Sequence, residues 1–307
     1  MDRSCHIQSM NAPHTRREFL HAALAMTGAM ACASASGDQP AADASPSALP
    51  LALSSVMFSE LTVEEFCAKA SGLGFAAMDL WCPFDRCRHL ESAAQSGASS
   101  FKALLTKYNL RRVSFTVFRT GVWNAGFPAY ARFIGECGGG TVVREAEYGR
   151  FETNELAAKM KAFFEKLKPE IELAAANGCV LAVENHGNGL LSTLDSLKAF
   201  TDINPDPKLV GIALAPFHLQ ATQASVEEAI RICASQLRFF YAWQHAEGTD
   251  QMPGLGATDF VPWLKALTTT HFSGLMSPFM HGGPPPAEMT QLVTRSVRYL
   301  KLCASKA

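Results

Sequence analysis

The stretch VLAVENHGNGL, residues 180–190, joins an apolar run to a cluster of polar side chains. Four apolar residues of this stretch, preceded by Cys179, lead directly into Glu184, Asn185 and His186, and two glycines follow. Burying a carboxylate, an amide and an imidazole is costly unless each group finds a partner. These groups are therefore expected either to be solvated at the end of a strand or to hold something there.

An apolar run followed by an amphipathic helical run recurs eight times from Leu51 onward. The first predicted helix, TVEEFCAKASGLG, has Thr62 as its expected N-cap and ends in glycines. Eight strand–helix units in about 250 residues are typical of a (β/α)8 barrel. The strands are predicted at 51–57, 75–81, 111–118, 141–147, 180–185, 209–215, 237–244 and 272–279.

A doubly wound open sheet is the alternative architecture. That fold would favour a glycine-rich phosphate loop after the first strand, but FSELT at 58–62 contains no glycine. The glycines of CGGG at 137–140 precede a predicted strand, so they indicate the end of a helix. We therefore predict an α/β fold, a single-domain (β/α)8 TIM barrel over residues 51–305.

Composition limits the classes of function. The chain has 307 residues, of which 48% are hydrophobic and 18% charged, as expected for a soluble globular protein. Its formal net charge of −1 gives no basic surface for nucleic acid. No apolar run in the mature chain is long enough for a transmembrane segment. None of the nine cysteines forms a Cys-x-x-Cys pair, which argues against a thiolate zinc site.

The N-terminal region has the pattern of an export signal. HTRREFLHAALAMTGAMACASASG at 14–37 contains Arg16 and Arg17 followed by small and apolar residues. We predict a twin-arginine signal peptide over 1–35, a flexible linker over 36–50, and a periplasmic or envelope-associated protein. An ordinary amphipathic helix is the alternative. Cys32 would carry a lipid anchor if the signal were processed as a lipoprotein.

In a (β/α)8 barrel, chemistry is carried out at the carboxyl ends of the strands. Four of the nine histidines fall at four consecutive predicted strand ends, from the fifth strand to the eighth. The predicted catalytic residues are Glu184 and His218, and the predicted substrate-binding residues are Trp81, Asn185, His186 and Trp243. The structural alternatives are a salt bridge between Glu184 and Arg144, and a loop cap for Asp79.

Four segments resemble the xylose-isomerase-like TIM-barrel superfamily of sugar isomerases and epimerases. They are GLGFAAMDLW (72–81), VLAVENHGNG (180–189), VGIALAPFH (210–218) and MPGLGATDFVPWLKAL (252–267). The resemblance covers residues 51–303. It implies one divalent metal, held by Glu, Asp, His and Glu from strands five to eight, and two glutamates that move a proton between carbons through an enediolate.

Only some of the ligands that the resemblance implies are present in this sequence. Glu184 matches the first ligand and acid–base residue, and His218 matches a substrate-binding histidine three residues after the second ligand. The second ligand itself is replaced by Ala215. The third position falls on Trp243, or on His245 after a two-residue slip, and the fourth falls near Ser277. The resemblance therefore implies a sugar isomerase or epimerase with a degenerate metal site.

Three interpretations remain open. In the first, Glu184, His218, His245 and His281 form a rebuilt site for Mn²⁺, Zn²⁺ or Mg²⁺. In the second, the protein is metal-free, and Glu184 or His218 is the base in a lyase or epimerase reaction on a keto-sugar. In both, a proton moves next to a carbonyl of a small carbohydrate. The alternative is a non-catalytic carbohydrate-binding barrel of the envelope, with Trp81, Trp123 and Trp243 as stacking platforms.

Overall fold

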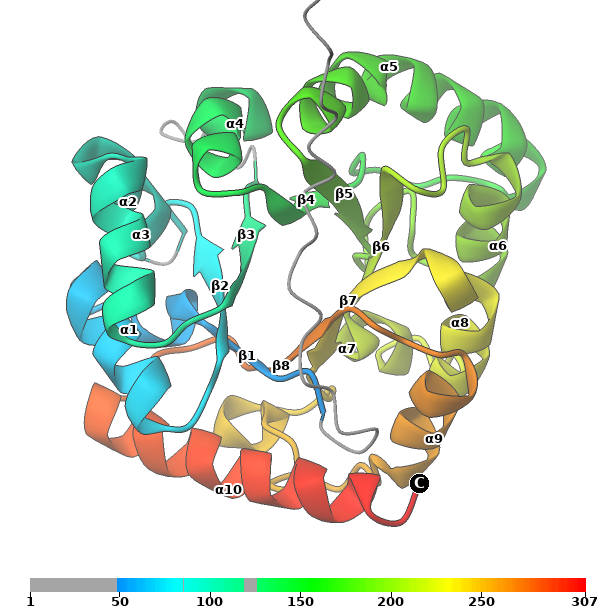
Figure 1. The fold of residues 1–307 in the computed structure, drawn as a ribbon. Helices are drawn as coiled ribbons and strands as arrows, with labels where there is room; N and C mark the ends of the chain where they lie inside the picture. Colours follow the sequence, from blue (N-terminus) through cyan, green and yellow to red (C-terminus); the bar gives the residue numbers. More distant parts are fainter. Residues whose placement is uncertain (1–48, 85, 119–125) are drawn as a thin grey trace, which may run out of the picture. The chain divides into compact units, whose positions relative to one another are not determined.

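The computed structural model describes residues 49–84, 86–118 and 126–307. The predicted signal peptide, Cys32, most of the predicted linker and Trp123 lie outside these ranges. Eight parallel strands form the centre of the described part, and each pairs with its neighbours in sequence order (Figure 1). The strands are β1 (Ala52–Ser54), β2 (Ala77–Trp81), β3 (Arg112–Thr116), β4 (Gly140–Glu145), β5 (Cys179–Glu184), β6 (Val210–Leu214), β7 (Leu237–Ala242) and β8 (Leu275–Pro278).

The last strand returns to the first and closes the ring. The Met276 amide donates a hydrogen bond of 2.9 Å to the Pro50 carbonyl, and Leu51 and Met276 form a parallel bridge. The hydroxyls of Ser54 and Ser277 lie 2.9 Å apart across the same junction. The predicted (β/α)8 barrel is therefore confirmed, and the open doubly wound sheet is wrong.

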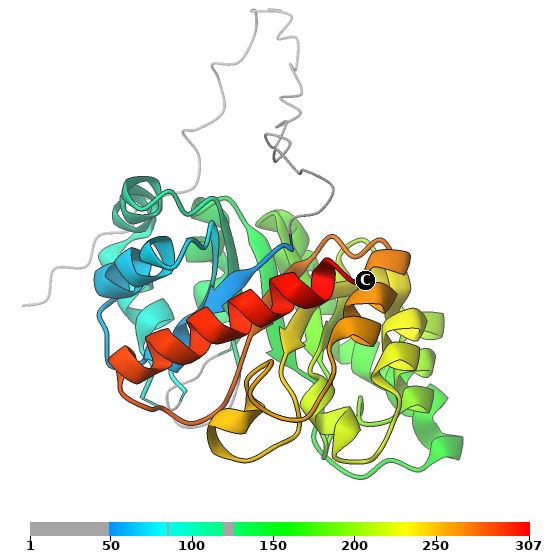
Figure 2. The same cartoon turned by 90° about the horizontal axis from the view of Figure 1, so that it is seen from below.

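Helices surround the strands on the outside of the ring, as Figure 1 shows. The predicted capping of the first helix is confirmed, since Thr62 and Glu65 form a reciprocal capping box. Figure 2 shows the last helix, which packs beside α9 and β8, from a second direction. The helices are α1 (Val63–Gly72), α2 (His89–Ser96), α3 (Ala98–Lys107), α4 (Phe127–Glu136), α5 (Leu156–Ala176), α6 (Leu194–Ile203), α7 (Pro216–Gln220), α8 (Val226–Cys233), α9 (Val261–Thr269) and α10 (Pro286–Ala304).

The first strand is shorter than predicted. It covers Ala52–Ser54, and a 3-10 helix, η1 (Ser55–Phe58), replaces the rest of the predicted run 51–57. The Ser55 hydroxyl accepts a hydrogen bond of 3.0 Å from the backbone N–H of Trp81, so a side chain takes the place of the next rung of the ladder. The other seven predicted strands are present, with bounds that differ from the prediction by at most three residues.

The turn at 137–140 is the helix stop that the sequence predicts. Gly139 has a φ of +74°, and a Cβ there would lie 2.1 Å from the backbone oxygen of Gly178. Only glycine allows this close approach between the starts of β4 and β5. No helix in the described ranges is long and apolar enough to cross a membrane. The seven cysteines of these ranges form no disulfide with one another.

Candidate functional site

A pocket opens at the carboxyl ends of the strands, where the barrel architecture predicts a site. Its walls combine carboxyl groups, imidazoles and aromatic rings from β2, β4 and β5 and from the segments that follow β2, β3, β4, β5, β6 and β8. The lining residues are Trp81, Phe84, Phe118, Glu145, Tyr148, Glu184, His186, His218 and His281.

Glu184 ends β5 with only 8% of its surface exposed. Among the described residues it has no hydrogen bond or ion pair. Burial raises the pKa of the Glu184 carboxyl to about 8, and the negative charges of Asp79 and Glu145 act in the same direction. Near neutral pH the Glu184 side chain is therefore mostly a neutral carboxylic acid, and a small rise in pH is enough to ionise it.

The predicted salt bridge between Arg144 and Glu184 does not form. Because side chains alternate along a strand, Arg144 leaves the opposite face of β4 from Glu145. Its guanidinium reaches Glu170 on α5 at 3.2 Å and lies over the Phe163 ring. Arg144 therefore pairs with a helix on the outside of the barrel and does not line the pocket.

Two histidines in contact with each other line the pocket together with Glu184. The ring centroids of His186 and His218 are 4.1 Å apart with the planes tilted by 41°. Burial lowers the pKa of both imidazoles. For His218 the pKa falls to about 3, and the neighbouring His186, His281 and His245 also disfavour its charge. Both rings are therefore neutral near pH 7. The Nδ1 atom of His186 is buried and has no hydrogen-bond partner among the described residues.

The four predicted metal ligands are only partly brought together. Glu184, His218 and His281 line the pocket, whereas His245 is exposed and is not part of the lining. In the described part of the chain, no group of three or more His, Cys, Asp or Glu side chains is placed to hold a metal ion.

The positions where the resemblance implies ligands do not supply a replacement set. Ala215 offers only a methyl group, and it is fully buried. The single N–H of the Trp243 indole is donated to Gln251 at 2.8 Å. The Ser277 hydroxyl is already bonded to Ser54 inside the barrel. The side chains present at these positions therefore do not fit the divalent metal of the resemblance.

The predicted substrate-binding residues divide into two groups. Trp81 and His186 line the pocket, although Trp81 is only 2% exposed and stacks on Phe279 as part of the wall. Trp243 does not line the pocket, because its indole stacks on Phe217 with centroids 4.1 Å apart. Neither tryptophan presents an open face for sugar stacking.

Asn185 has a structural role. Its amide nitrogen donates to the Ala215 carbonyl at 3.1 Å, and its amide oxygen accepts from the Ala215 N–H at 2.6 Å. The side chain thereby copies a strand rung and joins the ends of β5 and β6. It is fully buried and is not part of the pocket lining, so the structure gives no support to a substrate contact.

Asp79 is the centre of a buried polar network below the pocket. Its carboxylate accepts hydrogen bonds from the hydroxyls of Ser54, Ser114 and Thr116 and from the Trp81 indole. Burial nevertheless raises its pKa to about 6, although these donors act in the opposite direction. Asp79 therefore fixes the Trp81 wall of the pocket, and it is not the loop cap that the sequence suggests.

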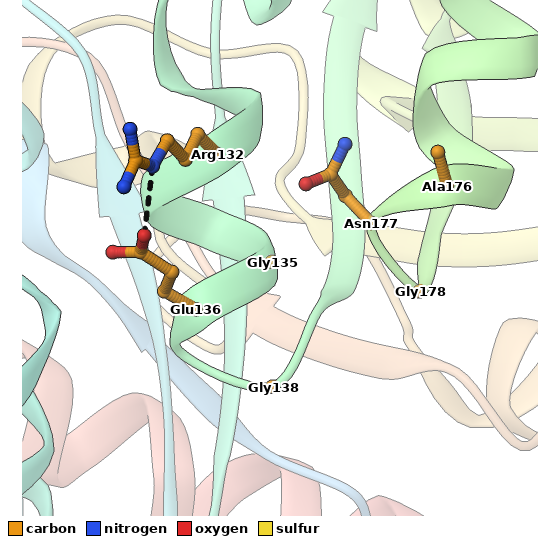
Figure 3. A pocket seen from close by; sticks show the side chains of 7 residues that line it. All are labelled: Arg132, Gly135, Glu136, Gly138, Ala176, Asn177 and Gly178. Atoms are coloured by element: carbon orange, nitrogen blue, oxygen red, sulfur yellow. Dashed lines mark hydrogen bonds and ion pairs between the residues drawn. The ribbon is translucent and has the colours of Figure 1, made fainter. Parts of the chain in front are cut away.

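A second, shallow depression lies at the opposite end of the barrel, between the carboxyl ends of α4 and α5 (Figure 3). Its one ion pair, Arg132 with Glu136, is an exposed i,i+4 pair on α4. This end of a barrel usually serves stability, and no buried titratable group lines the depression. It is lined by Arg132, Gly135, Glu136, Gly138, Ala176, Asn177 and Gly178.

Comparison with known proteins agrees with the barrel. A family model described as a xylose isomerase-like TIM barrel matches residues 67–302. The D-psicose 3-epimerase structure determined in the presence of D-fructose has a TM-score of 0.64 at 15% identity, covering 83% of this chain and 99% of that chain. The apo 3-keto-D-glucoside 4-epimerase YcjR from E. coli has a TM-score of 0.64 at 18% identity, with coverages of 83% and 100%.

A third similar structure is the IOLI protein with a bound zinc atom, with a TM-score of 0.65 at 14% identity, covering 84% of this chain and 99% of that one. No curated protein sequence matches the chain. At these identities the three structures establish a shared fold.

Proposed function

Because the chain belongs to the xylose isomerase-like TIM barrel family, we propose that it moves a proton beside the carbonyl group of a carbohydrate or keto-sugar. The observation that carries this proposal is Glu184, a buried carboxyl group with no hydrogen bond or ion pair to any residue that the structure describes, in a pocket shared with two neutral imidazoles. A carboxyl group kept only for stability would have a partner, since an unpaired buried charge is costly.

Glu184 is the base of the proposed reaction. A carboxylate with a pKa near the working pH is a stronger base than an ordinary one, and general catalysis is most efficient under that condition. When the Glu184 carboxylate takes a proton from the carbon beside the carbonyl, it becomes the neutral acid that burial favours. The environment of the side chain therefore assists proton abstraction.

His218 stabilises the negative charge that develops on the carbonyl oxygen. Its ring is neutral, lines the pocket and has no hydrogen bond among the described residues, so its N–H is free for a ligand. A neutral imidazole that donates to an enolate oxygen stabilises the transition state without giving up its proton.

The positions of the carboxyl groups favour some reactions over others. Glu145 and Glu184 end neighbouring strands, whereas the β2 and β8 side of the pocket contributes Trp81 and His281. Base catalysis from one side suits isomerisation or elimination, in which the proton need not return from the opposite face. Since the ligand positions do not fit a metal, no step is assigned to one, and removal of divalent ions is expected to leave turnover unchanged.

The substrate class is supported by two sources. The first is the resemblance of the sequence to sugar isomerases and epimerases. The second is a similar structure, a 3-keto-D-glucoside epimerase, which acts on a sugar that already carries a ketone. A ketone makes the neighbouring C–H more acidic. A site without a metal therefore needs to provide less stabilisation of the negative charge that forms when the proton is removed. The alternative of a non-catalytic barrel loses two of its three proposed platforms, because Trp81 and Trp243 are both buried; the third, Trp123, lies outside the described residues.

Deuterium exchange tests the proposal. Incubation of 3-keto-glucose with the protein in D2O is expected to place deuterium at the carbon beside the ketone, detected by NMR. Glu184→Gln should reduce this exchange by about 100- to 10,000-fold. Glu172→Gln, the same change on the exposed surface of α5, should leave it unchanged. Saturable sugar binding without exchange in the wild-type protein would favour the non-catalytic alternative.

We also propose that residues 1–35 direct export by the twin-arginine route to the periplasm or envelope. Support comes from Arg16-Arg17 followed by Phe19-Leu20 and the small, apolar run. Replacing both arginines by lysine should retain the protein in the cytoplasm in a fractionation assay. Labelling with palmitate in the wild type but not in Cys32→Ser would identify a lipid anchor.

A further inference from the structure

Tyr148 is an unusual residue on this molecule. Only two large apolar side chains of the described residues are exposed, Tyr148 at 53% and Leu302 at 54%. Leu302 lies near the end of α10, whereas Tyr148 follows β4 and lines the mouth of the pocket. An exposed aromatic ring beside a polar pocket has the arrangement expected of a ligand contact.

The backbone around Tyr148 is held firmly. The loop after β4 and the loop after β5 are joined by an antiparallel bridge between Tyr148 and Gly189. Hydrogen bonds of 2.9 Å from Gly149 to Asn188 and of 2.8 Å from Leu190 to Glu147 flank that bridge. This bridge and its two flanking hydrogen bonds, here called the clip, therefore position both Tyr148 and the loop that follows Glu184 at the end of β5.

The close approach of the two loops depends on a glycine. A Cβ at Gly189 would lie 3.2 Å from the Glu147 carbonyl and 3.4 Å from the His186 carbonyl. The Glu147 distance is tighter than most Cβ contacts, so a larger residue would require the loops to shift by a few tenths of an ångström. Gly189 therefore suits the close contact between the two loops.

The Tyr148 ring has a fixed orientation and an unused polar end. It meets the His186 ring edge to face, with centroids 5.4 Å apart and planes at 75°. Its hydroxyl forms no hydrogen bond with any described residue. The ring thus offers an apolar face and a phenolic O–H to a ligand that extends outward from Glu184.

We propose that Tyr148 forms an outer subsite that binds a group attached to the reacting sugar, an aglycone or a second sugar ring. This inference rests on the proposed function and extends it to a substrate class, glycosides in place of free monosaccharides. The reacting groups, Glu184 and His218, lie inside the pocket, while Tyr148 lies at its exposed mouth. A planar or C–H-rich substituent that extends out of the pocket would pack on the Tyr148 ring.

The test compares two probes, 3-keto-glucose and its phenyl β-glycoside. Their affinities are measured by calorimetry in the Glu184→Gln background, so that neither is consumed. The glycoside is expected to bind about five- to tenfold more tightly, the range typical of one aromatic contact. Adding Tyr148→Ala should abolish this preference and change the affinity for 3-keto-glucose by less than about twofold.

Two further variants sharpen the result. Tyr148→Phe keeps the ring and should retain most of the preference, and Leu302→Ala, the matched loss of an exposed apolar side chain, should retain all of it. Equal affinity for both probes, or a preference that survives Tyr148→Ala, would overturn the outer subsite alone. Binding of neither probe would overturn the proposed function together with the subsite.

Discussion

Glu145 and Glu184 lie directly opposite each other in the register of β4 and β5, and both line the same pocket. Two carboxyl groups so close in a water-poor site cannot easily both carry a charge. Their proximity is one cause of the raised pKa of Glu184, after burial and the charge of Asp79. The pairing of two strands thus contributes to the raised pKa of the side chain to which we assign the chemistry.

The stability of the protein should fall as pH rises through the range in which Glu184 ionises. The pKa of its carboxyl is raised on folding from 4.5 to about 8, so the folded state favours the protonated form. This contribution to the free energy of unfolding is fully present below pH 4.5 and is lost as pH rises through about 8. Urea unfolding of Glu184→Gln across pH 5 to 9 should show a shallower decline than wild type. An equal slope in both proteins would show that Glu184 ionises normally.

Arg144 should matter for stability and not for the acidity of the site. Its partner Glu170 is 9% exposed at the side chain, so Arg144→Met removes a largely buried ion pair and should lower the free energy of unfolding by about 3 kcal/mol. The pH at which kcat/KM is half-maximal should not move, since Arg144 does not contact Glu184. A shift of that midpoint to higher pH would mean that Arg144 stabilises the Glu184 carboxylate.

Asn185→Ala should act as a structural mutation. The variant leaves the N–H of Ala215 unpaired in the interior and removes one of the two hydrogen bonds to its C=O, which should lower the free energy of unfolding by about 2 kcal/mol. We expect KM measured well below the melting temperature to change by less than about threefold. A large rise in KM with unchanged stability would restore Asn185 as a substrate ligand.

Asp79→Asn should make Glu184 more acidic. Asp79 is fully buried, and its negative charge is the second cause of the raised Glu184 pKa. Asparagine still accepts a hydrogen bond from the Trp81 indole but carries no charge, so the pH midpoint of kcat/KM should move downward. Ser114→Ala, which removes one donor to Asp79 and keeps the charge, is the matched control. An unmoved midpoint in Asp79→Asn would remove Asp79 from the electrostatics of the site.

The fold was predictable from the sequence because it depends on repeated patterns. Eight apolar runs, the Thr62 cap and the glycine stop at 137–140 each have a local physical cause, and each is present in the structure. The shortened first strand was not predictable, because the hydroxyl of Ser55 bonds to Trp81, a residue 26 positions away.

The site was predictable only in part. Strand ends converge in a barrel, so Glu184, His186, His218 and His281 could be placed at one rim, and they do line one pocket. The roles of Asn185 and Trp243 depend on partners in other loops, Ala215 and Gln251, that no local pattern reveals.

Four lining residues, Phe84, Phe118, Glu145 and Tyr148, were not among the predicted site residues. Alternation along β4 was an available signal for Glu145, since it separates the inward carboxyl from the outward Arg144. The place of Tyr148 follows from the bridge to Gly189, which is a tertiary contact.

The pH dependence of deuterium exchange into 3-keto-glucose tests the central claim most directly. If Glu184 is the base, kcat/KM for exchange should rise about tenfold per pH unit below pH 7 and level off near the Glu184 pKa of about 8. Glu184→Gln should remove both the rate and the inflection. A wild-type profile that is flat from pH 5 to 9, or one that Glu184→Gln leaves intact, would contradict the account.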